Sequence, residues 1–113
     1  MIEHFYYILD DEGNVIKVPD VETWGLWFDA ASRSGARTIA RDKDEGPDGR
    51  EIFISTVFLG LDHRLTGDGP PLLWETLVFG GPLEGEMVRY DSREAALEGH
   101  QAMCRRVHQS LSK

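Results

Sequence analysis

The residues of this chain that could do chemistry gather in one stretch, Ile52–Gly81. Asp62 and His63 follow a strongly apolar run directly, and Glu75 interrupts a second apolar run. A buried charge without a partner costs several kcal/mol, so residues of this kind are paired, exposed or functional. An aspartate beside a histidine can hold the imidazole in one tautomer and raise its pKa, as general acid–base chemistry requires. We therefore expect a site in this stretch.

Glu75 is the most diagnostic of these residues, because it sits within the apolar run Leu72–Phe79. A carboxylate at such a position needs a base, hydrogen-bond donors, a ligand or water. The sequence leaves a structural ion pair and a ligand contact equally open. Together with Glu75, the residues that we expect to line a ligand pocket are Asp62, His63, Arg64, Trp74, Thr76, Arg89 and Tyr90.

Other candidate residues favour a structural role. Trp24 and Trp27 have helical spacing and are predicted to lie in the core, whereas core and pocket are both open for Trp74. His100 lies on an apolar helix stripe, which favours a hydrogen-bonded core histidine. Cys104 and His108 follow it at four-residue steps, but each step drifts about 40° around the helix. No close ligand pair, phosphate loop or nucleophile elbow occurs, so neither a metal site nor a cofactor is predicted.

The pattern around these residues predicts one α+β domain over residues 1–113, with the order ββαββββα. About five to six strands form a mostly antiparallel sheet, and two helices pack on it. Asp20 and Gly35 are the expected caps of the first helix, and Asp91 begins a capping box for the second. The expected strands are Phe5–Leu9, Val15–Val18, Arg37–Asp42, Glu51–Leu59, Leu72–Phe79 and Met87–Tyr90, and the helices are Val21–Ser34 and Ser92–Leu111.

Alternate residues of Glu51–Leu59 are apolar on both faces, which is typical of a central strand covered on both sides. Two helices can cover one face of so small a sheet. The second face then needs a homodimer, a ligand or strongly curved strands. We expect a homodimer.

Charge and composition limit the partners. The chain of 113 residues has a net charge of −8, and residues 1–30 contain seven acidic residues against Lys17 alone. No basic stripe of the kind that nucleic-acid binders carry is present, so direct nucleic-acid binding is not expected. The sequence shows no apolar run long enough to span a membrane and no leader pattern, and Cys104 is the single cysteine. These features predict a cytoplasmic protein.

Two phrases, STVFLGLDH from Ser55 to His63 and PPLLWETLVFGG from Pro70 to Gly81, resemble a small uncharacterised family common in bacteriophages and prophages. Thr23-Trp24 and Arg89-Tyr90 fit the same pattern. The family has no established activity to transfer. The resemblance implies a phage or prophage setting and the cytoplasm of a bacterial host, where small accessory proteins commonly act by binding.

These observations favour a non-catalytic pocket protein that sequesters a nucleotide-like host small molecule, of the anti-defence sponge type. The first alternative is an acidic inhibitor of a host defence or nucleic-acid-binding protein, acting through Asp10, Asp11 and Glu12. Further alternatives are a small hydrolase using Asp62, His63 and Glu75, and a virion structural protein. The expected partner is thus a small molecule or a host protein.

Overall fold

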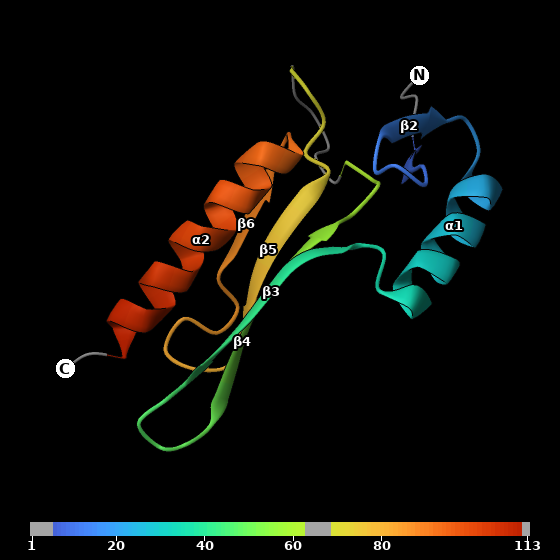
Figure 1. Ribbon diagram of the computed structural model, residues 1–113. Coiled ribbons are helices and arrows are strands. Elements are labelled where there is room, and N and C mark those ends of the chain that lie inside the picture. The colour runs from blue at the N-terminus through green and yellow to red at the C-terminus, as the bar shows by residue number, and fades with distance from the viewer. Residues whose placement is uncertain (1–5, 63–68, 112–113) are drawn as a thin grey trace.

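The computed structural model describes residues 6–62 and 69–111 of the chain. It contains six strands and two helices in the order ββαββββα, which confirms the predicted α+β fold (Figure 1). The strands form two antiparallel sheets, one with two strands and one with four, rather than one continuous sheet. The elements are β1 (Tyr6–Leu9), β2 (Val15–Val18), α1 (Val21–Ser34), β3 (Thr38–Glu45), β4 (Glu51–Phe58), β5 (Trp74–Phe79), β6 (Met87–Tyr90) and α2 (Arg93–Ser110).

The amino-terminal part is a hairpin, β1–β2, followed by α1. Asp20 caps α1 by accepting a hydrogen bond from the Thr23 amide at 2.7 Å, and Gly35 ends it with a φ of 82°. Both predicted caps are confirmed. The hairpin is tied to the rest of the chain at Gly60, whose carbonyl accepts from the Tyr7 amide at 2.8 Å. Gly60 has a φ of 73°, and a Cβ there would lie 2.5 Å from the Tyr7 carbonyl oxygen, so only glycine fits.

The larger sheet has the strand order β3-β4-β5-β6, and α2 packs across all four strands on one face (Figure 1). Its buried stripe consists of Ala96, His100, Met103 and Val107 and includes His100, as predicted. Gly99 lets the helix approach β6 closely, because a Cβ at that position would overlap the Tyr90 ring. The cap of α2 differs from the prediction. Ser92, not Asp91, accepts from a backbone amide, that of Ala95, at 3.0 Å.

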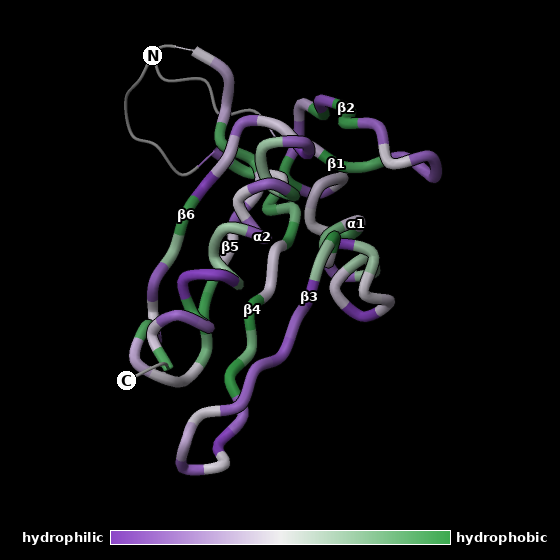
Figure 2. The backbone as a smooth tube through the Cα atoms, turned by 60° about the vertical axis from the view of Figure 1, so that its left-hand side comes forward, coloured by the Kyte–Doolittle hydropathy of each residue, from purple (hydrophilic) through white to green (hydrophobic). Residues whose placement is uncertain are grey.

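The two central strands carry the core, and an edge strand carries charge. Figure 2 shows β4 as an apolar strand beside β3, whose sequence TIARDKDE is largely hydrophilic. Charged edge strands discourage pairing with the edge of another sheet. On β4, Ile52, Ile54 and Phe58 are at most 1% exposed and form the floor of the core beneath α2.

Neither α1 nor α2, the helices within residues 6–62 and 69–111, is long and apolar enough to span a membrane.

Candidate functional site

The predicted pocket residues of β5 and β6 divide between the two faces of the sheet. Trp74 pairs with Tyr90 and Glu75 pairs with Arg89 in an antiparallel register. Neighbouring residues of a strand point to opposite faces. Trp74, Thr76 and Tyr90 therefore lie on the face that α2 covers, whereas Glu75 and Arg89 lie on the other. The structure does not bring these residues together in one cavity.

Glu75 meets a base on its own face. Its carboxylate accepts from Arg89 Nε at 3.0 Å, and the two side chains are 14% and 28% exposed. Arg37 is a second base near Glu75: burial lowers the pKa of Arg37, and the Glu75 carboxylate opposes that shift. Of the two interpretations that the sequence left open, the ion pair with Arg89 is present.

Trp74 belongs to the core. It is 5% exposed and packs edge-on against Phe58, with the ring centroids 5.3 Å apart. Trp27 contacts Phe58 from α1 in the same way at 5.7 Å. Trp24 stacks between Tyr6 and Phe28 at centroid distances of 5.8 and 4.7 Å. Trp24 and Trp27 were predicted to lie in the core, but both are only half-buried, with Trp27 packed against the buried cluster around Phe58.

A series of hydrogen-bonded polar groups, the polar series, runs through the core under α2. Tyr90 donates to Thr76 Oγ1 at 3.0 Å, and Thr76 Oγ1 lies 2.5 Å from Thr56 Oγ1. Thr56 Oγ1 lies 2.7 Å from His100 Nδ1, and His100 Nε2 lies 2.6 Å from Asp42 Oδ2. Thr56, Thr76 and His100 are fully buried. His100 is thus the hydrogen-bonded core histidine that the sequence predicted.

Two members of this polar series, Asp42 and Thr56, were not singled out from the sequence. Asp42 comes from the polar edge strand β3 and lies 58 residues before His100. A signal was present, because Asp42 and Asp44 alternate along β3 just as Thr56, Ile54 and Ile52 alternate along β4. The pattern of alternation therefore placed both aspartates on the α2 face, but nothing in the sequence showed that α2 reaches as far as β3, at the edge of the sheet.

Two further groups lie along the line where α2 meets β3. Cys104 Sγ is 3.7 Å from Asp42 Oδ2, and His108 Nδ1 is 3.2 Å from Asp44 Oδ2. Burial, together with the Asp42 carboxylate, raises the pKa of the Cys104 thiol to about 11. This line of contact thus carries a thiol, two imidazoles and two carboxylates.

The predicted residues after β4 are only partly described. Asp62 is half-buried and follows the bridge between Leu61 and Tyr6. His63 and Arg64 lie outside the described residues. The acid–base pair that the sequence suggested is therefore still a prediction.

The acidic hairpin turn uses one of its carboxylates internally. Asp10 accepts from the backbone amides of Glu12 and Asn14 at 2.9 and 2.8 Å, and from Asn14 Nδ2 at 3.2 Å. The hydrogen bond from the Asn14 amide is the main cause of the lowered pKa of Asp10. Asp11 and Glu12 are exposed. Of the three acids proposed for docking, Asp10 builds the turn, and Asp11 and Glu12 present charge.

The face of the larger sheet opposite α2 is open among the described residues, and we call it the open face. Phe79 and Met87 are 50% and 46% exposed, and its other three apolar side chains are half-buried. Arg41 stacks over the Phe53 ring at 4.9 Å, and Lys43 pairs with Glu51 at 3.3 Å. The open face consists of Arg41, Lys43, Glu45, Glu51, Phe53, Ser55, Val57, Glu75, Leu77, Phe79, Met87 and Arg89.

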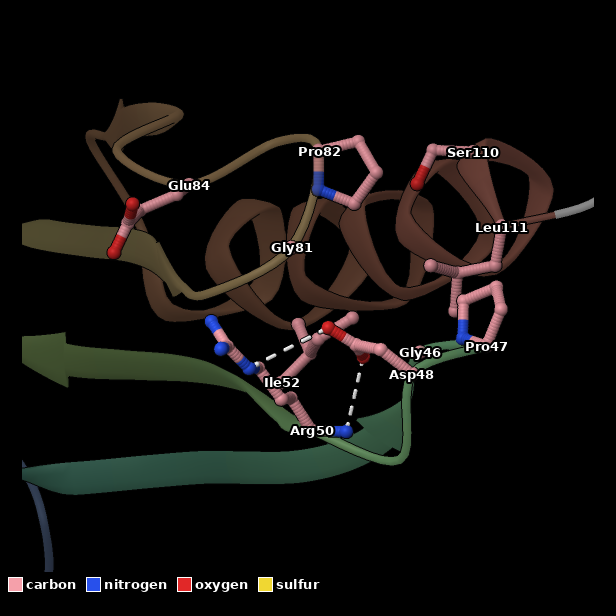
Figure 3. A pocket seen from close by; sticks show the side chains of 10 residues that line it. All are labelled: Gly46, Pro47, Asp48, Arg50, Ile52, Gly81, Pro82, Glu84, Ser110 and Leu111. Atoms are coloured by element: carbon pink, nitrogen blue, oxygen red, sulfur yellow. Dashed lines mark hydrogen bonds and ion pairs between the residues drawn. The ribbon is translucent and has the colours of Figure 1, made fainter.

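The cavities bordered by the described residues include two of more than about 400 Å³, a size that can hold a small molecule. One of about 630 Å³ lies between the β3–β4 turn and the end of α2, with Ile52 and Leu111 in its wall and an Asp48–Arg50 ion pair at its rim (Figure 3). The other, of about 440 Å³, lies where the hairpin meets the larger sheet. We call it the hairpin cavity. It is lined by Leu9, Glu12, Gly13, Asn14, Ala36, Thr38, Ile39, Trp74 and Arg93.

No protein-family model, no curated protein and no solved structure matches this chain. The resemblance to a phage family therefore stays a prediction.

Proposed function

We propose that this chain is a binding protein and that it works as a homodimer whose subunits meet through the open face. The supporting observation is the open face itself, which joins five apolar side chains into one surface with half-exposed Phe79 and Met87 at its edge. Contiguous exposed apolar patches on soluble proteins mark interaction sites. The homodimer expected from the sequence needs an exposed apolar surface of this kind as its interface.

Charge favours a second copy of the chain as the occupant. The open face contains three bases and three acids, so its net charge is zero, whereas the whole chain carries −8. Because each copy is acidic overall, two copies repel each other over most of their surface, but the neutral open face adds no such repulsion. The bases and acids are also paired within the face, as in Glu75–Arg89 and Lys43–Glu51, so they do not call for a partner of one sign. A strongly basic partner would gain nothing at this surface.

The size of the face predicts a dimer of modest affinity. Four strands spaced about 4.8 Å apart, each about six residues long, cover roughly 400 Å² in projection. Stable interfaces bury about 800 Å² per partner, and smaller ones are typical of weak or transient association. We therefore expect a dimer that dissociates on dilution through the micromolar range.

Analytical ultracentrifugation of matched variants tests this proposal. Phe79→Glu and Met87→Glu each put a charge into the apolar surface that the interface would bury, so either should shift the chain to its monomer mass of 12.8 kDa. Leu26→Glu is the control, because Leu26 is 77% exposed on α1 and is not one of the residues that form the open face. A wild-type monomer at all concentrations contradicts the proposal, as does a dimer that Leu26→Glu dissociates and the open-face variants do not.

A small-molecule role is the second candidate, and the hairpin cavity favours it. Trp74, one of the predicted pocket residues, forms part of its wall, and Arg93 at the first turn of α2 supplies a cation. A helix N-terminus adds positive potential for an anion. Glu12 and Asn14 offer acceptors and donors to a base or a sugar. A nucleotide-like ligand fits this set of groups.

Equilibrium dialysis with adenosine monophosphate as the probe tests this second candidate. Arg93→Gln should weaken binding by about tenfold or more, since it removes a charge-assisted hydrogen bond to phosphate. Arg105→Gln, which alters an exposed arginine of the same helix, should leave binding unchanged. Equal binding by both variants would exclude the cavity as the site.

A further inference from the structure

Three side chains with metal-ligating atoms converge where α2 crosses β3. Asp42 offers a carboxylate, His100 an imidazole and Cys104 a thiol, and their ligand atoms all lie within 4.8 Å of one another. The carboxylate oxygen is 2.6 Å from His100 Nε2 and 3.7 Å from Cys104 Sγ. These residues come from two elements far apart in the sequence. The helical spacing of His100, Cys104 and His108 alone does not bring three ligands together, whereas Asp42 from β3 completes a set of three.

The imidazole is held as a metal-binding histidine is held. Metal-ligating histidines bond their second ring nitrogen to another group, which fixes the ring and its tautomer. Here His100 Nδ1 is 2.7 Å from Thr56 Oγ1, and Nε2 points to the partly exposed Asp42 carboxylate. Hydroxyl groups both donate and accept. Thr56 Oγ1 can therefore accept a hydrogen bond from Nδ1–H, and the tautomer with its proton on Nδ1 leaves the Nε2 lone pair for a cation.

Two of the three separations between the ligand atoms are close to those of a tetrahedral site, and the third is within 4.8 Å. With metal–ligand bonds of about 2.0–2.3 Å, the ligand atoms of a tetrahedral site lie about 3.3–3.8 Å apart. Asp42 and Cys104 already have this separation, whereas Asp42 and His100 must separate by about 0.7 Å. The Asp42 side chain is 56% exposed. It can move by that amount without disturbing the core, while buried His100 stays in place.

The ligand set selects the class of metal. One thiolate, one imidazole and one carboxylate suit zinc, whereas calcium and magnesium prefer oxygen ligands alone. The Asp44 carboxylate, next along β3 on the same face, adds negative potential nearby. Asp44 is itself paired with His108 at 3.2 Å and is not part of the cluster.

We propose that Asp42 Oδ2, His100 Nε2 and Cys104 Sγ bind a zinc-class divalent cation, with water completing a tetrahedron, and that the ion clamps α2 onto β3. On binding, a metal–sulfur bond replaces the S–H bond of Cys104 and the thiol proton passes to solvent. The ring proton that Nε2 donates to the Asp42 carboxylate moves to Nδ1 by exchange with solvent, which frees the Nε2 lone pair for the metal. This proposal is independent of the open face, which lies on the other side of the sheet.

Cobalt(II) is the probe for this site, because a tetrahedral cobalt–thiolate centre has strong visible and charge-transfer absorption. The reduced full chain, titrated in a non-thiol reductant, should bind one Co²⁺ per chain with a thiolate-to-cobalt band. Cys104→Ser should abolish that band, and Asp42→Asn should weaken binding by at least about tenfold. Excess Zn²⁺ should remove the band from the wild-type chain.

Asp44→Asn and His108→Gln are the matched controls, because they alter the neighbouring aspartate–histidine pair on the same two elements. Both should bind Co²⁺ with the wild-type spectrum and affinity. Circular dichroism of each variant checks that it is folded. No Co²⁺ binding by the wild-type chain overturns the proposal. It is also overturned if Asp42→Asn retains wild-type affinity, or if the band depends on His108 instead.

Discussion

The two faces of the four-stranded sheet both combine apolar and polar residues, but these residues differ in burial and in hydrogen bonding. On the α2 face, polar groups are buried and bonded in series from Tyr90 to Asp42. On the open face, charged groups pair across strands and leave apolar side chains half-exposed between them. The first arrangement holds the chain together, whereas the second leaves a surface for association. One strand, β4, supplies apolar residues to both faces.

The largest difference between the faces should appear in stability. Ile54 on the α2 face is 1% exposed, and Leu77 on the open face is half-buried. Ile54→Ala should lower the free energy of unfolding by about 3 kcal/mol and Leu77→Ala by about 1 kcal/mol, because the smaller loss reflects partial burial. Urea denaturation of dilute protein measures both. Equal losses would mean that the open face is as well covered as the other.

The reactivity of Cys104 should report how closely α2 seals against β3. With its pKa raised from 9.0 to about 11, the thiol is protonated at neutral pH. Its alkylation by iodoacetamide should then be about 100-fold slower than that of a free thiol. The rate should rise with pH up to about 11, where the thiolate becomes the main form. Mass spectrometry in a chelating buffer follows the reaction. A rate equal to that of the urea-unfolded chain would contradict this result.

The polar series under α2 should be more sensitive than polar groups on the open face. Thr56→Val keeps the shape of the side chain but leaves His100 Nδ1 and the Thr76 hydroxyl with one partner fewer. We expect a loss of about 1–3 kcal/mol, the cost of an unsatisfied buried polar group. Ser55 precedes Thr56 on the same strand and faces the other side of the sheet. Ser55→Ala should change stability by less than about 0.5 kcal/mol. Similar effects of the two substitutions would show that the series contributes no stability.

The smallest effect should come from the ion pair of the open face. Glu75 and Arg89 are partly solvated, so a double-mutant cycle of Glu75→Gln and Arg89→Gln should give a coupling energy of about 0.5–1 kcal/mol. Thermal denaturation at low and high salt measures it. A coupling of several kcal/mol would place this pair in a dry environment.

The sequence predicted the fold more completely than the site. Periodicity and caps located α1 at its observed bounds, Val21–Ser34, because both signals are local. The contact between Asp42 and His100 joins residues 58 positions apart, and no local pattern encodes which strand lies beside a helix. Trp74 and Glu75 were expected in one pocket, yet adjacent residues of a strand face opposite ways. Strand alternation, applied strictly, separates them in advance.

The most direct test of the open face as a subunit interface is an amide NMR dilution series on the ¹⁵N-labelled chain. Concentration-dependent shifts should be concentrated at the open face, in particular at Phe53, Ser55, Leu77 and Met87. The outward residues of α2 should not shift. Spectra that do not change with concentration, or shifts confined to the hairpin and α1, would mean that the open face is not a subunit interface.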